Sequence, residues 1–161
     1  MRLLERHDWK VWVFLSVIIA LFGVGDIQIG GETYAGGEAV AFSGITGMTW
    51  DQLKSSDPAA ARLIDSQVRS GGALLLMVGL LSLAVAISGL RRGERWAWLT
   101  MWLWPAWLVL LLVQLMFTER VPGAGIPVPA ISGSIFLVVT LGLLALSYRK
   151  YRATSARPPE G

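Results

Sequence analysis

The chain has 161 residues, of which 54% are apolar and only 16% are charged, and its formal net charge is +3. The charged residues stand in blocks between long uncharged stretches, which excludes an ordinary soluble domain and is typical of a chain embedded in a bilayer. The absence of Cys excludes disulfides, thiolate metal sites, a cysteine nucleophile and covalently attached c-type haem. The basic residues flank apolar segments, a pattern that favours anionic lipid over nucleic acid, so we expect no nucleic-acid partner.

Four apolar segments of about twenty residues predict four membrane-spanning helices, because twenty residues at about 1.5 Å each match a hydrocarbon core of about 30 Å. The predicted spans cover residues 11–29, 71–90, 96–117 and 128–148. The first span is interpreted as an anchor rather than a cleaved signal peptide, because Gly25 and Asp26 follow its apolar run without a clear cleavage signal.

The segment between the first two spans, residues 30–70, is expected outside the membrane and partly helical. Residues 30–47 are rich in Gly and are interpreted as a loop or short ribbon against the bilayer surface. Thr49 is predicted to cap a short helix, and Asp57 followed by Pro58 is predicted to open another. No breaker follows Pro58 for several turns, so the second helix is expected to begin before its membrane span.

The remaining connections differ in length and composition. The turn before the third span is only a few residues long, so the second and third helices are predicted to be antiparallel neighbours. Within the third span, Pro105 is expected to bend the helix because it has no N–H and crowds the previous turn. The turn after this span, rich in Pro and Gly, is expected to form an ordered irregular loop, and the tail 152–161 is expected to be flexible.

The distribution of Lys and Arg predicts the orientation, because the side that is not translocated accumulates cations. Ten basic residues fall on the side of the two termini, and four fall on the other side. The termini and the turn at 91–95 are therefore expected in the cytoplasm, with residues 30–70 outside.

Tryptophans occur both at the predicted membrane surface and deeper in the third span. Trp96 and Trp98 follow the Arg-rich turn and are interpreted as headgroup anchors, with the cations as topology determinants; the residues concerned are Arg91, Arg92, Arg95, Trp96 and Trp98. Trp104 and Trp107 lie deeper and share a helix face with Gln114. They can form a wall for a flat hydrophobic ligand or pack against other helices, and packing is favoured.

No ionisable side chain falls at the middle of any span, which excludes ion pumps and proton relays. Asp26 and Gln114 lie near outer ends, and Asp65 and Arg69 are one turn apart and can pair. The sole histidine, His7, is near the N-terminus, which excludes a His-ligated haem or metal within the bundle. We predict no catalytic residues and no metal site.

Three motifs, GITGMTWDQL, SSDPAAARLID and RRGERWAWLTMWLWP, lie between Gly44 and Pro105. In these motifs the chain resembles an uncharacterised family of small bacterial proteins with four transmembrane helices. The resemblance covers somewhat more than a third of the chain. It implies a four-helix architecture in the bacterial inner membrane and carries no catalytic residues over.

We therefore predict an all-α membrane protein, an antiparallel four-helix transmembrane bundle with a partly helical extracytoplasmic segment between its first two helices. The first functional hypothesis is a non-catalytic accessory or structural subunit of a larger membrane assembly, such as a respiratory or photosynthetic one. The alternative is a binding protein or enzyme for a lipid, quinone, pigment or sterol-like molecule in an outward-facing pocket. That pocket would be lined by Asp26, Arg69, Trp104, Trp107 and Gln114.

Overall fold

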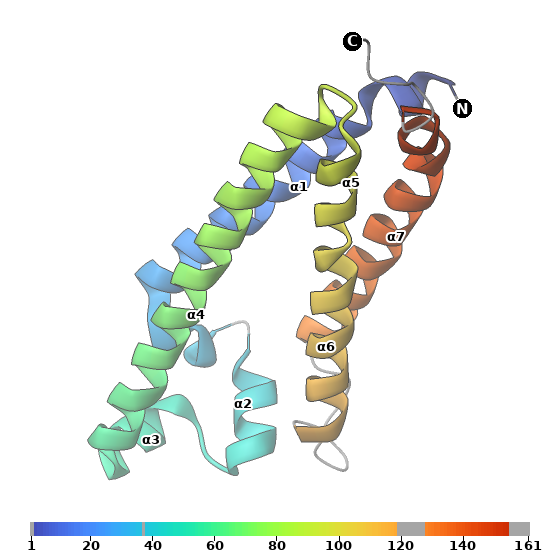
Figure 1. Ribbon diagram of the computed structural model, residues 1–161. Coiled ribbons are helices and arrows are strands. Elements are labelled where there is room, and N and C mark those ends of the chain that lie inside the picture. The colour runs from blue at the N-terminus through green and yellow to red at the C-terminus, as the bar shows by residue number, and fades with distance from the viewer. Residues whose placement is uncertain (1, 37, 119–127, 155–161) are drawn as a thin grey trace.

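The computed structural model describes residues 2–36, 38–118 and 128–154, and within these ranges the chain is helical and contains no strand (Figure 1). The Pro- and Gly-rich turn after the third span and residues 155–161 of the tail lie outside the described residues. The elements in chain order are α1 (Arg2–Ile29), η1 (Gly30–Ala35), α2 (Ala39–Thr46), α3 (Trp50–Ser56), α4 (Pro58–Val85), η2 (Ala86–Leu90), α5 (Arg95–Met101), α6 (Leu103–Thr118) and α7 (Val128–Thr154).

Four helical stretches in the described part of the chain are long and apolar enough to cross a membrane. They cover His7–Ala35, Pro58–Leu90, Arg95–Leu115 and Ala130–Tyr148. Many large apolar side chains on these helices are exposed on the protein surface, as expected for helices surrounded by lipid. The findings support a multi-pass membrane protein, with helices that extend beyond several of the predicted spans.

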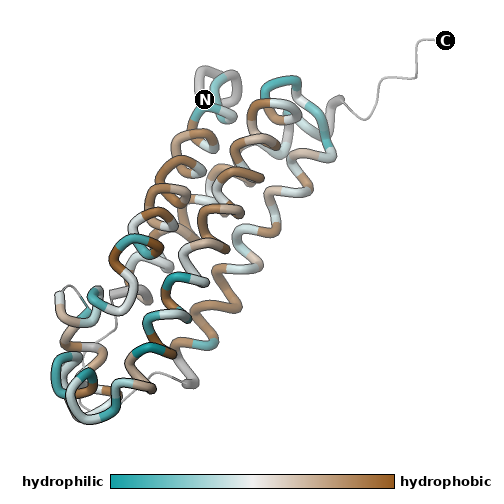
Figure 2. The backbone as a smooth tube through the Cα atoms, turned by 90° about the vertical axis from the view of Figure 1, so that its left-hand side faces the viewer, coloured by the Kyte–Doolittle hydropathy of each residue, from teal (hydrophilic) through white to brown (hydrophobic). Residues whose placement is uncertain are grey.

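The long helices form two pairs that separate toward one end (Figure 1). α1 lies along α4, and α6 lies along α7. The pairs are close at the end with the two termini, and they diverge toward the end where α2 and α3 lie. We call these the inner end and the outer end, after the orientation that the sequence predicts. Figure 2 shows apolar residues along the helices and polar residues gathered toward the two ends.

Glycines allow the close approach of α1 and α4. A Cβ atom on Gly72 would lie 2.7 Å from both Asp26 Cβ and the Gly23 carbonyl oxygen. A Cβ atom on Gly79 would likewise lie 2.7 Å from the backbone nitrogen of Ala20. Gly72 and Gly79 are therefore packing positions of the α1–α4 contact, because no larger side chain fits there.

The start of the outer segment differs from the sequence prediction. Residues 30–47, expected as a loop or ribbon, contain the 3₁₀-helix η1 and the α-helix α2. Gly30, with φ of 58°, turns the chain after α1, and Gly47, with φ of 72°, ends α2. The physical reason is tertiary packing: Phe42, on one face of α2, is buried and makes ring contacts that sequence alone does not reveal.

The two predicted caps of the outer segment are confirmed. Thr49 forms a capping box with Gln52 at the start of α3. The Asp57 carboxylate accepts hydrogen bonds from Ala59 N and Ala60 N, and Pro58 occupies the first turn of α4. α4 therefore begins where the sequence predicts, well before its apolar part.

The third span is interrupted at Trp102, between α5 and α6. Trp102 N donates to Leu99 O at 3.1 Å. This bond joins residues three positions apart, as in a 3₁₀-helix, whereas α-helical bonds join residues four positions apart. Pro105 has no N–H for Met101 O, so the regular helical bond between these residues cannot form. The distortion expected at Pro105 thus appears one turn earlier in the chain.

Candidate functional site

The buried side chains form two clusters at opposite ends of the molecule. The inner cluster consists of Trp12, Leu15, Ile19, Ala86, Leu90, Ala97, Trp98, Met101, Trp104, Leu144 and Tyr151. The outer cluster consists of Phe42, Trp50 and Ala61, with Tyr34, Leu53 and Ile64 packed against it. The outer cluster belongs to η1 and α2–α4, so it does not join α4 to α6.

An apolar groove of about 580 Å³ lies between α4 and the α5–α6 helix. One wall comes from α4, with Val78, Ser82 and Val85. The facing wall includes Trp104 and Trp107 of α6. We call this region the α4–α6 groove.

Trp104 forms a rigid part of the groove wall. Its side chain is 4% exposed, and its indole Nε1 donates to Ser82 Oγ at 2.7 Å. Its ring makes an edge contact with Trp12, with centroids 6.0 Å apart. The indole N–H is therefore satisfied within the chain, and these contacts hold Trp104 in place in the groove wall. The lining contains no ionisable side chain, so its chemistry suits binding rather than acid–base catalysis.

The structure brings together only part of the pocket predicted from the sequence. Trp104 and Trp107 line the same groove, whereas Gln114 is an exposed residue of α6 outside the lining. Asp26 packs beside Gly72 in the α1–α4 contact. Arg69 lies in the outer half of α4, where it contacts the end of α1, and it is not part of the groove lining. The sequence spacing identified the two tryptophans correctly as a shared face, but could not show which helix lies opposite.

Arg69 and Asp65 instead hold the outer end of α1. Their side chains pair with Nε to Oδ2 at 2.9 Å. Asp65 Oδ1 accepts from Gly31 N at 2.7 Å, and Arg69 donates to the carbonyl oxygens of Ile27 and Gln28. These bonds satisfy backbone groups at the junction of α1 and η1, which explains the pair as a structural feature.

The outer cluster is stabilised by rings and by charges at its rim. Tyr34 stacks on Phe42 with centroids 4.8 Å apart, and Trp50 contacts both rings. Trp50 Nε1 donates to Glu32 Oε1 at 3.2 Å, and Lys54 Nζ lies 3.0 Å from the same oxygen. Hydrogen bonds to Asp51 and then Glu32 raise the pKa of Lys54. The segment is thereby held as a folded cap on the ends of α1 and α4.

A buried polar network joins three parts of the chain at the inner end. Lys150 Nζ lies 2.7 Å from Asp8 Oδ1, and the Tyr151 hydroxyl lies 3.1 Å from Asp8 Oδ2 and 3.2 Å from Leu90 O. Burial, and then the charge of Asp8, raise the pKa of Tyr151. Sequence reasoning missed this network, although Asp8, between the basic residues Arg6 and Lys10, is a weak signal for a buried partner.

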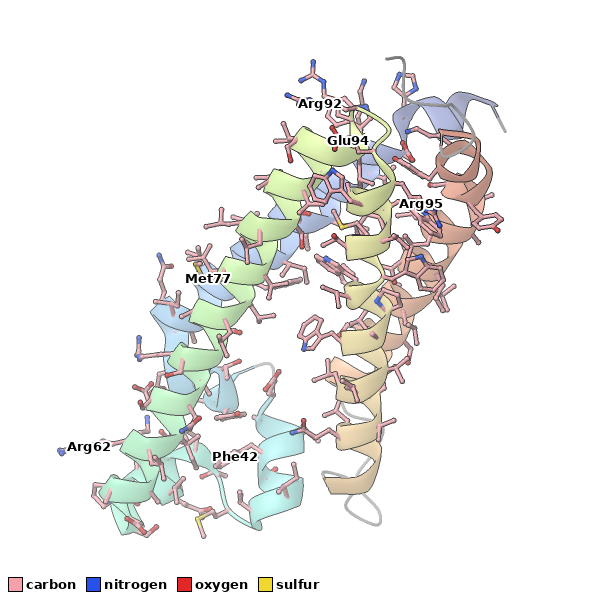
Figure 3. The ribbon with its side chains drawn as sticks, viewed as in Figure 1. Phe42, Arg62, Met77, Arg92, Glu94 and Arg95 are labelled. Atoms are coloured by element: carbon pink, nitrogen blue, oxygen red, sulfur yellow. The ribbon has the colours of Figure 1, made fainter. Side chains whose placement is uncertain are left out.

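The Arg-rich turn between α4 and α5 is also at the inner end. The Arg91 guanidinium lies 5.5 Å from the centroid of the Trp9 ring. The Glu94 carboxylate accepts a hydrogen bond from the Trp96 indole N–H. Figure 3 shows Arg92 at the tip of the turn, pointing away from the helices. Cationic and indole side chains therefore meet at this surface.

The two tryptophans expected as headgroup anchors differ in environment. Trp96 is 48% exposed, as an anchor would be, but Trp98 is 9% exposed and belongs to the inner cluster. Trp98 Nε1 donates to Leu144 O at 3.3 Å, and its ring stacks on Tyr151. Trp98 is thus a core residue that joins α5 to α7.

Neither a protein-family model, nor a curated protein, nor a solved structure matches this chain. The resemblance based on the three motifs accordingly stays a prediction.

Proposed function

We propose that the chain is an antiparallel four-helix transmembrane bundle of the bacterial inner membrane, with both termini in the cytoplasm. The four candidate spans and the excess of Lys and Arg at the inner end support this topology. The three motifs support the bacterial location.

The chain contains no Cys, so single cysteines can test the topology. In whole cells, Gln52→Cys in α3 should react with an impermeant maleimide. Arg92→Cys in the inner turn should react only after the membrane is permeabilised. Labelling of Arg92→Cys but not Gln52→Cys in intact cells would show the opposite orientation.

We further propose that the protein binds a lipophilic molecule in the α4–α6 groove without catalysing a reaction on it. The groove itself is the observation on which this proposal depends: about 580 Å³, walled by Trp104 and Trp107 and free of ionisable side chains. This volume falls within the range of about 300–1,000 Å³ found for small-molecule sites. One turn of a helix about 11 Å wide takes up roughly 500 Å³, so the groove suits a chain-like or flat molecule better than a whole helix.

Filling the groove tests this function. Ala106 lies in the lining, and Ala145 is an exposed residue of α7 outside it. Native mass spectrometry of the purified wild-type protein should detect a retained lipophilic molecule, and Ala106→Trp should abolish retention while Ala145→Trp preserves it. Trp107→Ala should weaken retention and leave the fold intact. An empty wild-type protein, or equal retention by the two Trp variants, would refute the proposal.

An accessory subunit of a larger membrane assembly is the second candidate. A specific observation favours it: a Cβ atom on Gly71 or Gly142 would meet nothing within 4 Å, so these small residues are not needed for packing within the chain. Small residues on a helix surface permit close contact with another transmembrane helix.

The second candidate predicts association with other proteins. Purification in a gentle detergent should yield larger complexes, and Gly142→Leu should release the 17.5 kDa chain from them. A wild-type protein that is monomeric under the same conditions, together with an unchanged Gly142→Leu variant, would argue against this role.

A further inference from the structure

The α4–α6 groove and the Arg-rich turn lie along the same helices. The turn directly connects η2, which continues α4, to α5. At 1.5 Å per residue, the lining residues of α4 from Val85 to Val78 lie about 8 to 18 Å from Leu90, where the helix ends. One leaflet of the hydrocarbon core is about 15 Å thick. The groove therefore begins at the depth of the acyl chains in the leaflet next to the turn and extends to about the middle of the bilayer.

Trp96 lies between the turn and the groove. A Cβ atom on Gly89 would lie 2.8 Å from Trp96 Cζ2, so the indole packs against the end of the α4–η2 helix. One helical turn beyond Trp96, Thr100 lines the groove, and its hydroxyl donates to Trp96 O at 2.9 Å. Thr100, Trp104 and Trp107 then follow at successive turns on the groove side. Trp96 and the groove residues thus follow one another at helical spacing along α5 and α6.

The turn presents positive charge at the inner end of these helices. It carries three guanidinium groups, from Arg91, Arg92 and Arg95, against the single carboxylate of Glu94. Glu94 accepts the hydrogen bond from Trp96, and Arg92 is exposed at the tip (Figure 3). Guanidinium groups bind phosphate oxygens through charge-assisted hydrogen bonds.

We propose that the occupant of the groove is an anionic phospholipid from the inner leaflet. One acyl chain lies between α4 and α6 against Trp104 and Trp107, and the headgroup phosphate is bound at the turn by Arg92 with Arg91 nearby. The inference rests on the proposed lipophile-binding function and specifies its ligand. The positive turn selects the headgroup, and the groove selects an apolar chain of leaflet length.

The test uses phosphatidylglycerol and phosphatidylcholine with identical acyl chains. The purified full-length chain is equilibrated in detergent with equal amounts of both, and the bound lipids are counted by native mass spectrometry. The wild-type protein should retain one phosphatidylglycerol in preference to phosphatidylcholine. Arg92→Gln should lower this preference about fivefold, since one basic residue near an anionic surface contributes about that factor. Lys54→Gln, at the outer end, should leave the preference unchanged.

The variants distinguish the proposed phospholipid headgroup site from the more general function of binding a lipophilic molecule. Arg92→Gln should still retain a lipid, because its groove is intact. Ala106→Trp should retain neither phosphatidylglycerol nor phosphatidylcholine. Equal retention of both lipids by the wild-type protein, with Arg92→Gln unchanged, would refute the headgroup assignment and leave lipophile binding in place. Retention of no lipid by the wild-type protein would refute both. An equal loss of preference in Lys54→Gln and Arg92→Gln would show nonspecific charge attraction and contradict a site at the turn.

Discussion

Lys150 Nζ lies 2.7 Å from Asp8 Oδ1, although the two residues are 142 positions apart in the chain. The contact joins the beginning of α1 to the end of α7. The Tyr151 hydroxyl, within hydrogen-bonding distance of both Asp8 and Leu90 O, brings the end of η2 into the same network. The inner ends of three membrane-spanning elements are thereby fixed together, while α4 and α6 diverge toward the outer end (Figure 1).

Lys150→Met should destabilise the protein, because the Asp8 side chain is only 4% exposed and would lose its ion-pair partner. Removing one partner of such a pair should lower the free energy of unfolding by about 2–3 kcal/mol. Denaturation in detergent micelles measures this quantity. Lys54→Met, which breaks exposed pairs at the outer end, is the matched control and should have a much smaller effect. Equal effects of the two variants would contradict a buried inner network.

Alkaline pH should weaken the fold through Tyr151. Because burial and Asp8 raise the pKa of its hydroxyl in the folded state, only the unfolded state releases this proton just above pH ~10. The stabilisation is therefore complete below the unfolded pKa and is lost as the pH rises beyond it. Tyr151→Phe should make the decline in unfolding free energy shallower. The same slope for the variant and the wild-type protein would show that Tyr151 is not held neutral by its surroundings.

The α1–α4 contact should not tolerate even a methyl group. Gly72→Ala should lower the free energy of unfolding by about 1–3 kcal/mol, because its Cβ would lie 2.7 Å from Asp26 Cβ and from the Gly23 carbonyl. Gly142→Ala is the control, since its Cβ would meet nothing within 4 Å. That change should be neutral or stabilise by up to about 1 kcal/mol. Similar losses at both positions would indicate a general helix effect rather than close packing.

Asp65 should control the junction between α1 and η1. Asp65→Ala removes the acceptor for Gly31 N and the partner of Arg69, so the Gly31 amide should exchange its hydrogen roughly ten times faster. Hydrogen exchange of the protein in micelles measures the rate. Asp51→Ala removes an exposed carboxylate from the same outer region and should leave this amide unchanged. Slow exchange in Asp65→Ala would show that the bond does not hold the junction.

Local sequence signals predicted much of the fold. The four apolar segments fall in four helices of sufficient length, and the caps at Thr49 and Asp57 form as expected. These features depend on neighbours within a few positions. The π-helical segment at Ala86–Leu90 was not predicted, and neither was the helical start of the outer segment. Both depend on contacts with other helices, such as the packing of Gly89 against Trp96 and Ala97.

The candidate site could be predicted only in part for the same reason. Helical spacing placed Trp104 and Trp107 on one face, and the structure places both in the groove. The partner of Trp104 is Ser82, on another helix and without a sequence signal of its own. Asp26 and Arg69 looked like pocket residues because they are polar near a span end, but their contacts are within the α1–α4 pair and its junction with η1.

A photo-crosslinking residue placed at Ala106 tests most directly what occupies the α4–α6 groove. Ultraviolet light applied to membranes containing this variant should attach one lipid to the chain, seen by mass spectrometry as a single small adduct. The same residue at Val138, 71% exposed on α7 and outside the lining, should give far less of one defined product. Crosslinking of Ala106 to another protein, or identical products at the two positions, would contradict a lipid-binding groove.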